Sequence, residues 1–154
     1  MIVSNASPLI VLLKIDKITI LEELFQKIIV PEAVFKEITA KEDQRLIFGR
    51  LTWIEARKAR YVEVAFLENF VNSGEAQAIA LAKKLNATLL MDDAKARKYA
   101  KLLNVKVIGT LGLLKMAKRG GLIQSVRKVI DDMLAEGYYI EEKLIRRILQ
   151  DVGE

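Results

Sequence analysis

Polar side chains that can do chemistry follow three short apolar runs of the sequence. Asn5 and Ser7 follow the first run, Asp92 and Asp93 follow a second, and Thr110 follows a third. If these runs are parallel strands, their carboxyl ends meet at one edge of a sheet, where the functional groups of open α/β folds gather. We therefore expect these side chains to lie close together.

Two glutamates are further candidates for the same edge. Glu75 falls in the first turn of a predicted helix, and Glu37 falls in the helix predicted after Pro31. Crowded carboxylates repel one another, and a cation that neutralises them makes their convergence tolerable. The chain has no histidine and no cysteine, so an activated water would need a hard cation held by Asp and Glu. The expected metal is Mg²⁺ or Mn²⁺.

Each candidate residue also has a purely structural interpretation. Glu37 can pair with Lys41 one helical turn away, and Glu75 can complement the dipole of its helix. One of the two aspartates can be an N-cap, as can either hydroxyl residue. The joint arrangement, and not any single residue, favours a metal site.

The composition limits the kind of protein. The chain has 154 residues, 52% of them hydrophobic and 29% charged, which predicts one folded domain with a sizeable core and excludes long disorder. No apolar run reaches the roughly 18 residues that a membrane span needs, and no charged leader precedes the first run, so we expect a soluble, cytoplasmic protein without membrane contact. The formal net charge of +5 mildly favours a polyanionic partner.

The apolar pattern predicts short strands that alternate with helices. Strands are expected over residues 1–4, 27–30, 51–56, 88–91 and 105–108. Helices are expected over residues 10–24, 32–40, 63–70, 74–85, 94–103, 111–118, 123–136 and 141–150, with Pro31 opening the second and Ser73 capping the fourth. This alternation predicts an α/β fold with a parallel sheet covered on both faces. We expect one domain over 1–154, with a core over 1–120 that carries the acidic site and a helical C-terminal appendage over 121–154.

Five blocks of the sequence resemble, in order, those of the PIN-domain family. They are residues 3–10 (VSNASPLI), 30–38 (VPEAVFKEI), 73–82 (SGEAQAIALA), 90–93 (LMDD) and 109–114 (GTLGLL). The resemblance covers about residues 1–120 and is nearest to a prokaryotic PIN-like branch related to toxin ribonucleases. It implies a Rossmann-like α/β/α sandwich, a nuclease dependent on Mg²⁺ or Mn²⁺ that acts on RNA, frequent dimerisation and, in toxins, inhibition by an antitoxin protein.

The resemblance also assigns residues. The four acids of the family fall on Asn5, Glu37, Glu75 and Asp93, with Asp92 adjacent to the last. The small hydroxyl residues near the site match Ser7 and Thr110. Asn5 departs from the family, which has Asp there. An amide oxygen can ligate Mg²⁺ but carries no charge, so metal affinity and water activation should fall unless Asp92 supplies the missing charge.

Basic side chains that could hold a nucleic-acid backbone follow the acidic blocks. They are Arg97, Lys98, Lys115, Lys118 and Arg119. Each of them can also be an ordinary charged residue on a solvent-exposed helix face. The apolar helices over 10–24 and 111–118 are more apolar than the surface of a lone domain, so we expect a homodimer that buries part of them.

Two functions of different classes remain open at this point. The first is a metal-dependent ribonuclease, and the second is a catalytically weak or inactive PIN-like module that binds RNA or a protein partner. A receiver-like domain would need paired acids after the first strand, where the chain has Ser4 and Asn5. A P-loop nucleotidase is disfavoured because no glycine-rich run ends in Lys-Ser or Lys-Thr.

Overall fold

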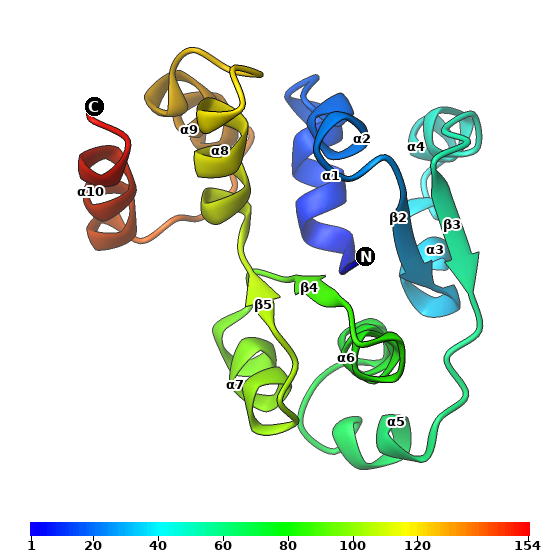
Figure 1. Cartoon of the computed structure of the whole chain (residues 1–154). Helices are drawn as coiled ribbons and strands as arrows, with labels where there is room; N and C mark the ends of the chain where they lie inside the picture. Colours follow the sequence, from blue (N-terminus) through cyan, green and yellow to red (C-terminus); the bar gives the residue numbers. More distant parts are fainter.

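A five-stranded sheet lies at the centre of the computed structural model, which describes residues 1–154 (Figure 1). Its strands are β1 (Ile2–Ser4), β2 (Ile28–Pro31), β3 (Ile54–Arg57), β4 (Thr88–Leu90) and β5 (Val107–Ile108). Their order is β3-β2-β1-β4-β5, and every neighbouring pair is parallel. The central strand pairs Val3 with Ile29 on one side and with Leu89 on the other. The predicted α/β fold with a central parallel sheet is confirmed.

Ten helices surround this sheet. They are α1 (Ala6–Lys14), α2 (Thr19–Phe25), α3 (Glu32–Ile38), α4 (Glu42–Phe48), α5 (Val62–Leu67), α6 (Ser73–Leu85), α7 (Ala94–Leu102), α8 (Thr110–Arg119), α9 (Val126–Ala135) and α10 (Glu142–Asp151). Helices α6 and α7 lie on one side of the sheet, and α1 and α8 lie on the other (Figure 1). None of the ten combines the length and the apolar character needed to cross a membrane.

The strands read as unbroken apolar runs because both faces of the sheet are covered. Every residue of β1 and β2 is buried, and Val3, Ile28 and Leu89 have no exposed surface. The edge strand β3 is only partly buried, and its Glu55 pairs with Lys27 at 2.5 Å and with Arg57 at 3.3 Å. Charged side chains on an edge strand discourage pairing with another sheet.

Local details differ from the sequence-based expectations at several element ends. The third strand begins at Ile54 instead of residue 51, and the fifth at Val107 instead of residue 105, because the Val105 amide instead donates to the Ala100 carbonyl and closes α7. Pro31 ends β2 and is the N-cap residue of α3, not its first helical residue. Helix α4 was not predicted.

The apolar helices behind the dimer expectation use their apolar side chains within the chain. Leu9 and Leu12 of α1 and Leu113 and Leu114 of α8 have no exposed surface. Folding of one chain therefore covers part of these helices, whereas Leu13 is half-buried and Met116 is 37% exposed, and the homodimer stays a prediction.

Glu154 connects the three C-terminal helices α8, α9 and α10. The Glu154 carboxylate accepts hydrogen bonds from Lys118 Nζ at 2.6 Å, from Ser125 Oγ at 3.0 Å and from the backbone amides of Val126 and Arg127 at 2.8 and 3.1 Å. These donors connect the end of α10 to α8 and to the first turn of α9. The bond from Lys118, and then those from the α9 amides, lower the pKa of Glu154 to about 2.

We predict that Glu154→Gln destabilises the protein at neutral pH, because an amide cannot replace the charge that these donors hold. The folded-state pKa lies below the ordinary value, so this stabilisation is complete above pH 4.5 and disappears as the pH falls toward 2. Urea unfolding at pH 7 and pH 3 should show a difference between variant and parent that shrinks at pH 3. Glu142→Gln, which breaks an exposed ion pair with Arg146, is the control and should have little effect at either pH. An equal difference at both pH values for Glu154→Gln would contradict the prediction.

Candidate active site

A large pocket opens at the carboxyl edge of the sheet, where β1, β4 and β5 end. The Asn5 amide donates to the Leu90 carbonyl at 3.0 Å, and the Met91 amide donates to the Ile108 carbonyl at 3.0 Å, so the three strand ends are held side by side. The cavity has a volume of about 1460 Å³. All the acids and hydroxyl residues singled out above line it: Asn5, Ser7, Glu37, Glu75, Asp92, Asp93 and Thr110.

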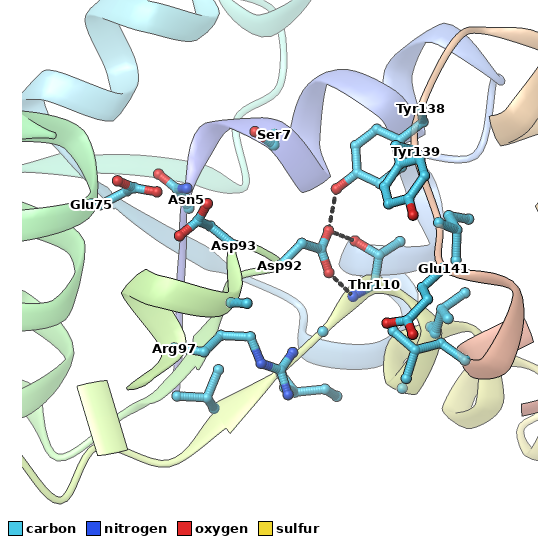
Figure 2. Close-up of a pocket in the computed structure, with 18 of the residues that line it drawn as sticks. Asn5, Ser7, Glu75, Asp92, Asp93, Arg97, Thr110, Tyr138, Tyr139 and Glu141 are labelled. Carbon is cyan, nitrogen blue, oxygen red and sulfur yellow. Dashed lines mark hydrogen bonds between the residues drawn. The ribbon is translucent and has the colours of Figure 1, made fainter. Parts of the chain in front are cut away.

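Asn5 lies at the end of the central strand and precedes the first turn of α1. Its side chain makes no capping hydrogen bond to that helix. The residue is only 7% exposed, and Figure 2 shows its amide beside the carboxylates of Glu75 and Asp93. The amide oxygen is therefore available to the pocket.

Glu75 is fixed by a reciprocal cap at the start of α6. Asn72 Oδ1 accepts a hydrogen bond from the backbone amide of Glu75 at 2.8 Å, and Glu75 Oε1 accepts one from the backbone amide of Asn72 at 3.1 Å. Asn72, and not Ser73 as expected, is thus the N-cap residue. The cap holds a carboxylate that is only 9% exposed at the pocket wall.

Glu37 reaches the same wall from α3. Its Oε1 atom lies 3.3 Å from the point where a Cβ atom on Gly74 would be. A glycine at this position allows the start of α6 to approach Glu37 closely. The ion pairs of the structure do not include Glu37, so the pairing with Lys41 is not formed.

Burial and neighbouring charge raise the proton affinity of the acids at this end of the pocket to different degrees. Burial raises the pKa of Glu37 and, as the largest cause, that of Glu75. The backbone hydrogen bond from Asn72 and the charge of Lys95 lower the pKa of Glu75, whereas the charges of Asp93 and Glu37 raise it. Two carboxylates on other elements thus act on Glu75, and we call Glu37, Glu75 and Asp93 the acid group.

The two adjacent aspartates face different parts of the pocket. Asp93 caps α7 through a bond from the Ala96 amide at 2.8 Å, and its carboxylate faces Asn5 and Glu75 (Figure 2). Asp92 turns the other way. Its oxygens accept from the Thr110 amide at 2.7 Å, from Thr110 Oγ1 at 2.6 Å and from the Tyr138 hydroxyl. Asp92 therefore lies in the pocket but outside the acid group.

Comparison with known proteins fits this arrangement of acids at the sheet edge. A family model described as a PIN domain matches residues 1–154. The chain belongs to the PIN-domain family. No curated protein matches the sequence. Membership in the family indicates a nuclease-type function, and PIN domains generally use divalent metals.

The donors of this PIN domain suit a hard cation in their chemistry. Carboxylate and amide oxygens are the ligands that Mg²⁺ prefers. No three acids lie close enough together to hold a metal among them, so the protein can contribute only part of a coordination sphere. Mg²⁺ commonly keeps several waters and uses one or two carboxylates together with substrate phosphates. The residues fit that kind of site.

The five basic residues predicted to grip nucleic acid fall into two groups. Arg97 and Lys98 line the pocket, and Arg97 Nη1 donates to the Met91 carbonyl at 3.1 Å. Lys115, Lys118 and Arg119 do not line it, because α8 starts at the pocket with Thr110 and then runs away by about 1.5 Å per residue.

Two of these distant cations have other partners. Lys115 pairs with Asp151 at 3.3 Å and Lys118 with Glu154 at 2.6 Å, both at the end of α10. These ion pairs compete with a phosphate for the two lysines, and their predicted contact with nucleic acid stays a prediction.

Sequence reasoning missed one whole wall of the PIN-domain pocket. It is formed by the segment between α9 and α10 and the start of α10, through Tyr138, Tyr139, Ile140, Glu141 and Leu144. Lys101 on α7 was missed as well. The doubled tyrosine after Gly137 was the available signal, but only the tertiary structure brings it to the sheet edge.

We predict that Glu75→Gln stabilises the protein when no divalent metal is present. The variant keeps an oxygen that can accept from the Asn72 backbone amide. It removes a negative charge that burial and the neighbouring carboxylates destabilise. The folded pKa of Glu75 lies above its ordinary value, so the penalty is absent below pH 4.5 and complete above the raised pKa. In EDTA, the urea midpoint of the variant should exceed that of the parent at pH 7, and the gap should close at pH 4. Glu23→Gln, an exposed change on α2, is the control. A variant less stable than the parent at pH 7 would refute the electrostatic account.

Proposed function

We propose that this PIN domain is a divalent-metal-dependent ribonuclease that hydrolyses phosphodiester bonds. The observation that supports it best is the acid group, because three carboxylates on separate elements line the same pocket as the Asn5 amide at the end of the central strand. Such crowding is unfavourable without a cation and becomes favourable with one.

In this proposal the protein donors to Mg²⁺ or Mn²⁺ come from Asn5, Glu37, Glu75 and Asp93, with no more than two of the three acids bound at once, and waters and substrate phosphate would fill the other positions. A metal held there would supply an activated water and stabilisation of the charge that develops on the phosphoryl oxygens. The chain fixes two of the donors in advance, since Glu75 is held by the Asn72 amide and Asp93 by the Ala96 amide.

Arg97 lines the pocket and is held by the backbone. Its bond to the Met91 carbonyl orients the guanidinium, which can pair with a phosphoryl oxygen of a bound strand. Gly109 leaves room for it, because a Cβ atom there would lie 2.5 Å from Arg97 Nη1. Lys98 lines the same side of the pocket and can contact a neighbouring phosphate.

The proposal extends to the biological setting. We infer a cytoplasmic toxin of a toxin–antitoxin pair, with RNA as substrate, an antitoxin protein as partner and a single domain that forms a homodimer. The resemblance of the five sequence blocks to the toxin-related branch supports this part.

A second function is favoured by one specific feature. Asn5 brings no charge, and no three acids gather closely enough to hold a metal on their own. These two facts suit a catalytically weak or inactive PIN-like module that binds RNA or a protein partner.

The substitution Asn5→Asp separates the two functions. Without metal, the added charge increases repulsion in the acid group and should lower the melting temperature. With Mg²⁺ or Mn²⁺ it should tighten metal binding by about 1 to 3 kcal/mol, the size of one charge-assisted contact. The metal-induced rise in melting temperature should then exceed that of the parent, and cleavage of single-stranded RNA in Mn²⁺ should increase.

The control is Asp93→Asn in the Asn5→Asp background, which should abolish both gains. If Asn5→Asp folds normally and changes neither metal affinity nor RNA cleavage, the pocket is not a cation site. The binding-module function then replaces the nuclease.

A further inference from the structure

The end of the pocket opposite the acid group has a wall that is firmly anchored. Tyr138 is partly buried, and its hydroxyl donates to Asp92, which Thr110 also holds through two hydrogen bonds. Burial and then the Asp92 charge raise the pKa of Tyr138, so the phenol remains a donor at any physiological pH. The wall is thus fixed to the strand end that also carries Asp93.

The next residue on this wall presents an aromatic ring that nothing covers. Tyr139 is 85% exposed and lines the pocket (Figure 2). The aromatic pairs of the structure involve only Phe66, Phe70 and Tyr99, so the Tyr139 ring has no stacking partner. Leu102 and Leu144, 66% and 46% exposed, line the same pocket. An open flat ring with apolar neighbours is therefore available to a ligand.

Cations that line the same pocket as this ring identify the ligand chemistry. Lys98 and Lys101 are exposed, lie three residues apart on α7 and make no ion pair. Arg97, one residue before Lys98, adds a third cation to the lining. An aromatic platform next to a row of cations is the combination with which proteins bind single-stranded nucleic acid. Glu141 is the one carboxylate on this wall, and its negative charge works against the attraction of a phosphate by the cations.

We propose that this end of the pocket is a nucleobase subsite for a single-stranded polynucleotide: one base stacks on Tyr139, and the adjoining phosphate pairs with Lys98 and Lys101. The inference rests on the proposed function in that it deepens it, because the same strand would continue past Arg97 to the acid group. Single strands are required, since a base inside a duplex has no free face to offer.

The test is binding of a fluorescein-labelled eight-nucleotide single strand, followed by fluorescence anisotropy in Ca²⁺ to avoid turnover. Tyr139→Ala should weaken binding about tenfold, within the range that one base stacked on an aromatic ring contributes. Tyr139→Trp should bind at least as well as the parent, because it keeps a ring. Phe66→Ala, which removes an exposed ring on α5 outside the pocket, is the control and should bind like the parent.

A probe with one abasic position removes the base instead of the ring. Moved along the strand, the abasic position should weaken binding to the parent at one place and should have no further effect there in Tyr139→Ala. RNA and DNA probes of the same sequence identify the natural strand, and stacking predicts the Tyr139 effect with whichever binds. Equal binding of the parent and Tyr139→Ala, or an undiminished affinity for a duplex of the same sequence, would overturn the subsite.

The charged residues give a second, independent readout. Lys98→Ala with Lys101→Ala should weaken binding and reduce its dependence on salt, whereas the matched pair Lys84→Ala with Lys128→Ala should do neither. Glu141→Gln should tighten binding by removing the opposing charge. No change from either substitution would count against the phosphate contact.

Failure of the subsite and failure of the nuclease are distinguishable. RNA cleavage by the parent in Mn²⁺, with loss of cleavage in Asp93→Asn, tests the nuclease and does not require Tyr139. Loss of binding in Tyr139→Ala tests the subsite and does not require cleavage.

Discussion

Repulsion among three carboxylates at the carboxyl edge of the sheet is the constraint around which this PIN domain is arranged. Glu37, Glu75 and Asp93 come from α3, α6 and the end of β4, and burial and mutual charge raise the pKa of Glu75. They would drift apart if they were carried by free loops. Instead, helix caps fix Glu75 and Asp93, and Gly74 lets α6 approach Glu37. Helix caps and close helix packing, which stabilise folds in general, thus hold groups of like charge together at this site.

The parts of the fold that the sequence predicted are those governed by local pattern. The residues of β1 and β2, and those of β4 after Thr88, are buried, so their runs are mostly apolar and easy to recognise. Helix α4 was missed because its seven residues bury only Gln44 and Phe48, which leaves no clear apolar stripe. Within the acid group, Glu75 and Asp93 carry local signals, since one lies in the first turn of a helix and the other follows a strand, whereas Glu37 lies near the end of α3 and was assigned by the resemblance.

The parts that the sequence did not predict depend on distant partners. Asp92 and Asp93 are adjacent and chemically identical, and nothing local distinguishes them. Asp92 is drawn away by Thr110, 18 residues further on, and by Tyr138, 46 residues further on. In the same way, the sequence did not predict that Lys115 and Lys118 pair with Asp151 and Glu154, each 36 residues further along the chain. Tertiary structure determines which residues pair when they lie this far apart in the sequence, and such pairs leave no periodic pattern in it.

The charges that line the pocket would make the binding of a metal and the binding of a polyanion depend on each other. Five carboxylates and three basic side chains line it, so without a cation its field opposes a phosphate backbone, despite the positive net charge of the whole chain. In the proposed nuclease, a divalent ion would offset the two excess negative charges and would leave Lys98, Lys101 and Arg97 to attract phosphates. Because the two ligands would favour each other, metal affinity should be higher with nucleic acid bound than without it, by the same factor in either order of addition. Substrate phosphate would then complete the partial coordination that Asn5 and the acid group offer, as a partly hydrated Mg²⁺ allows.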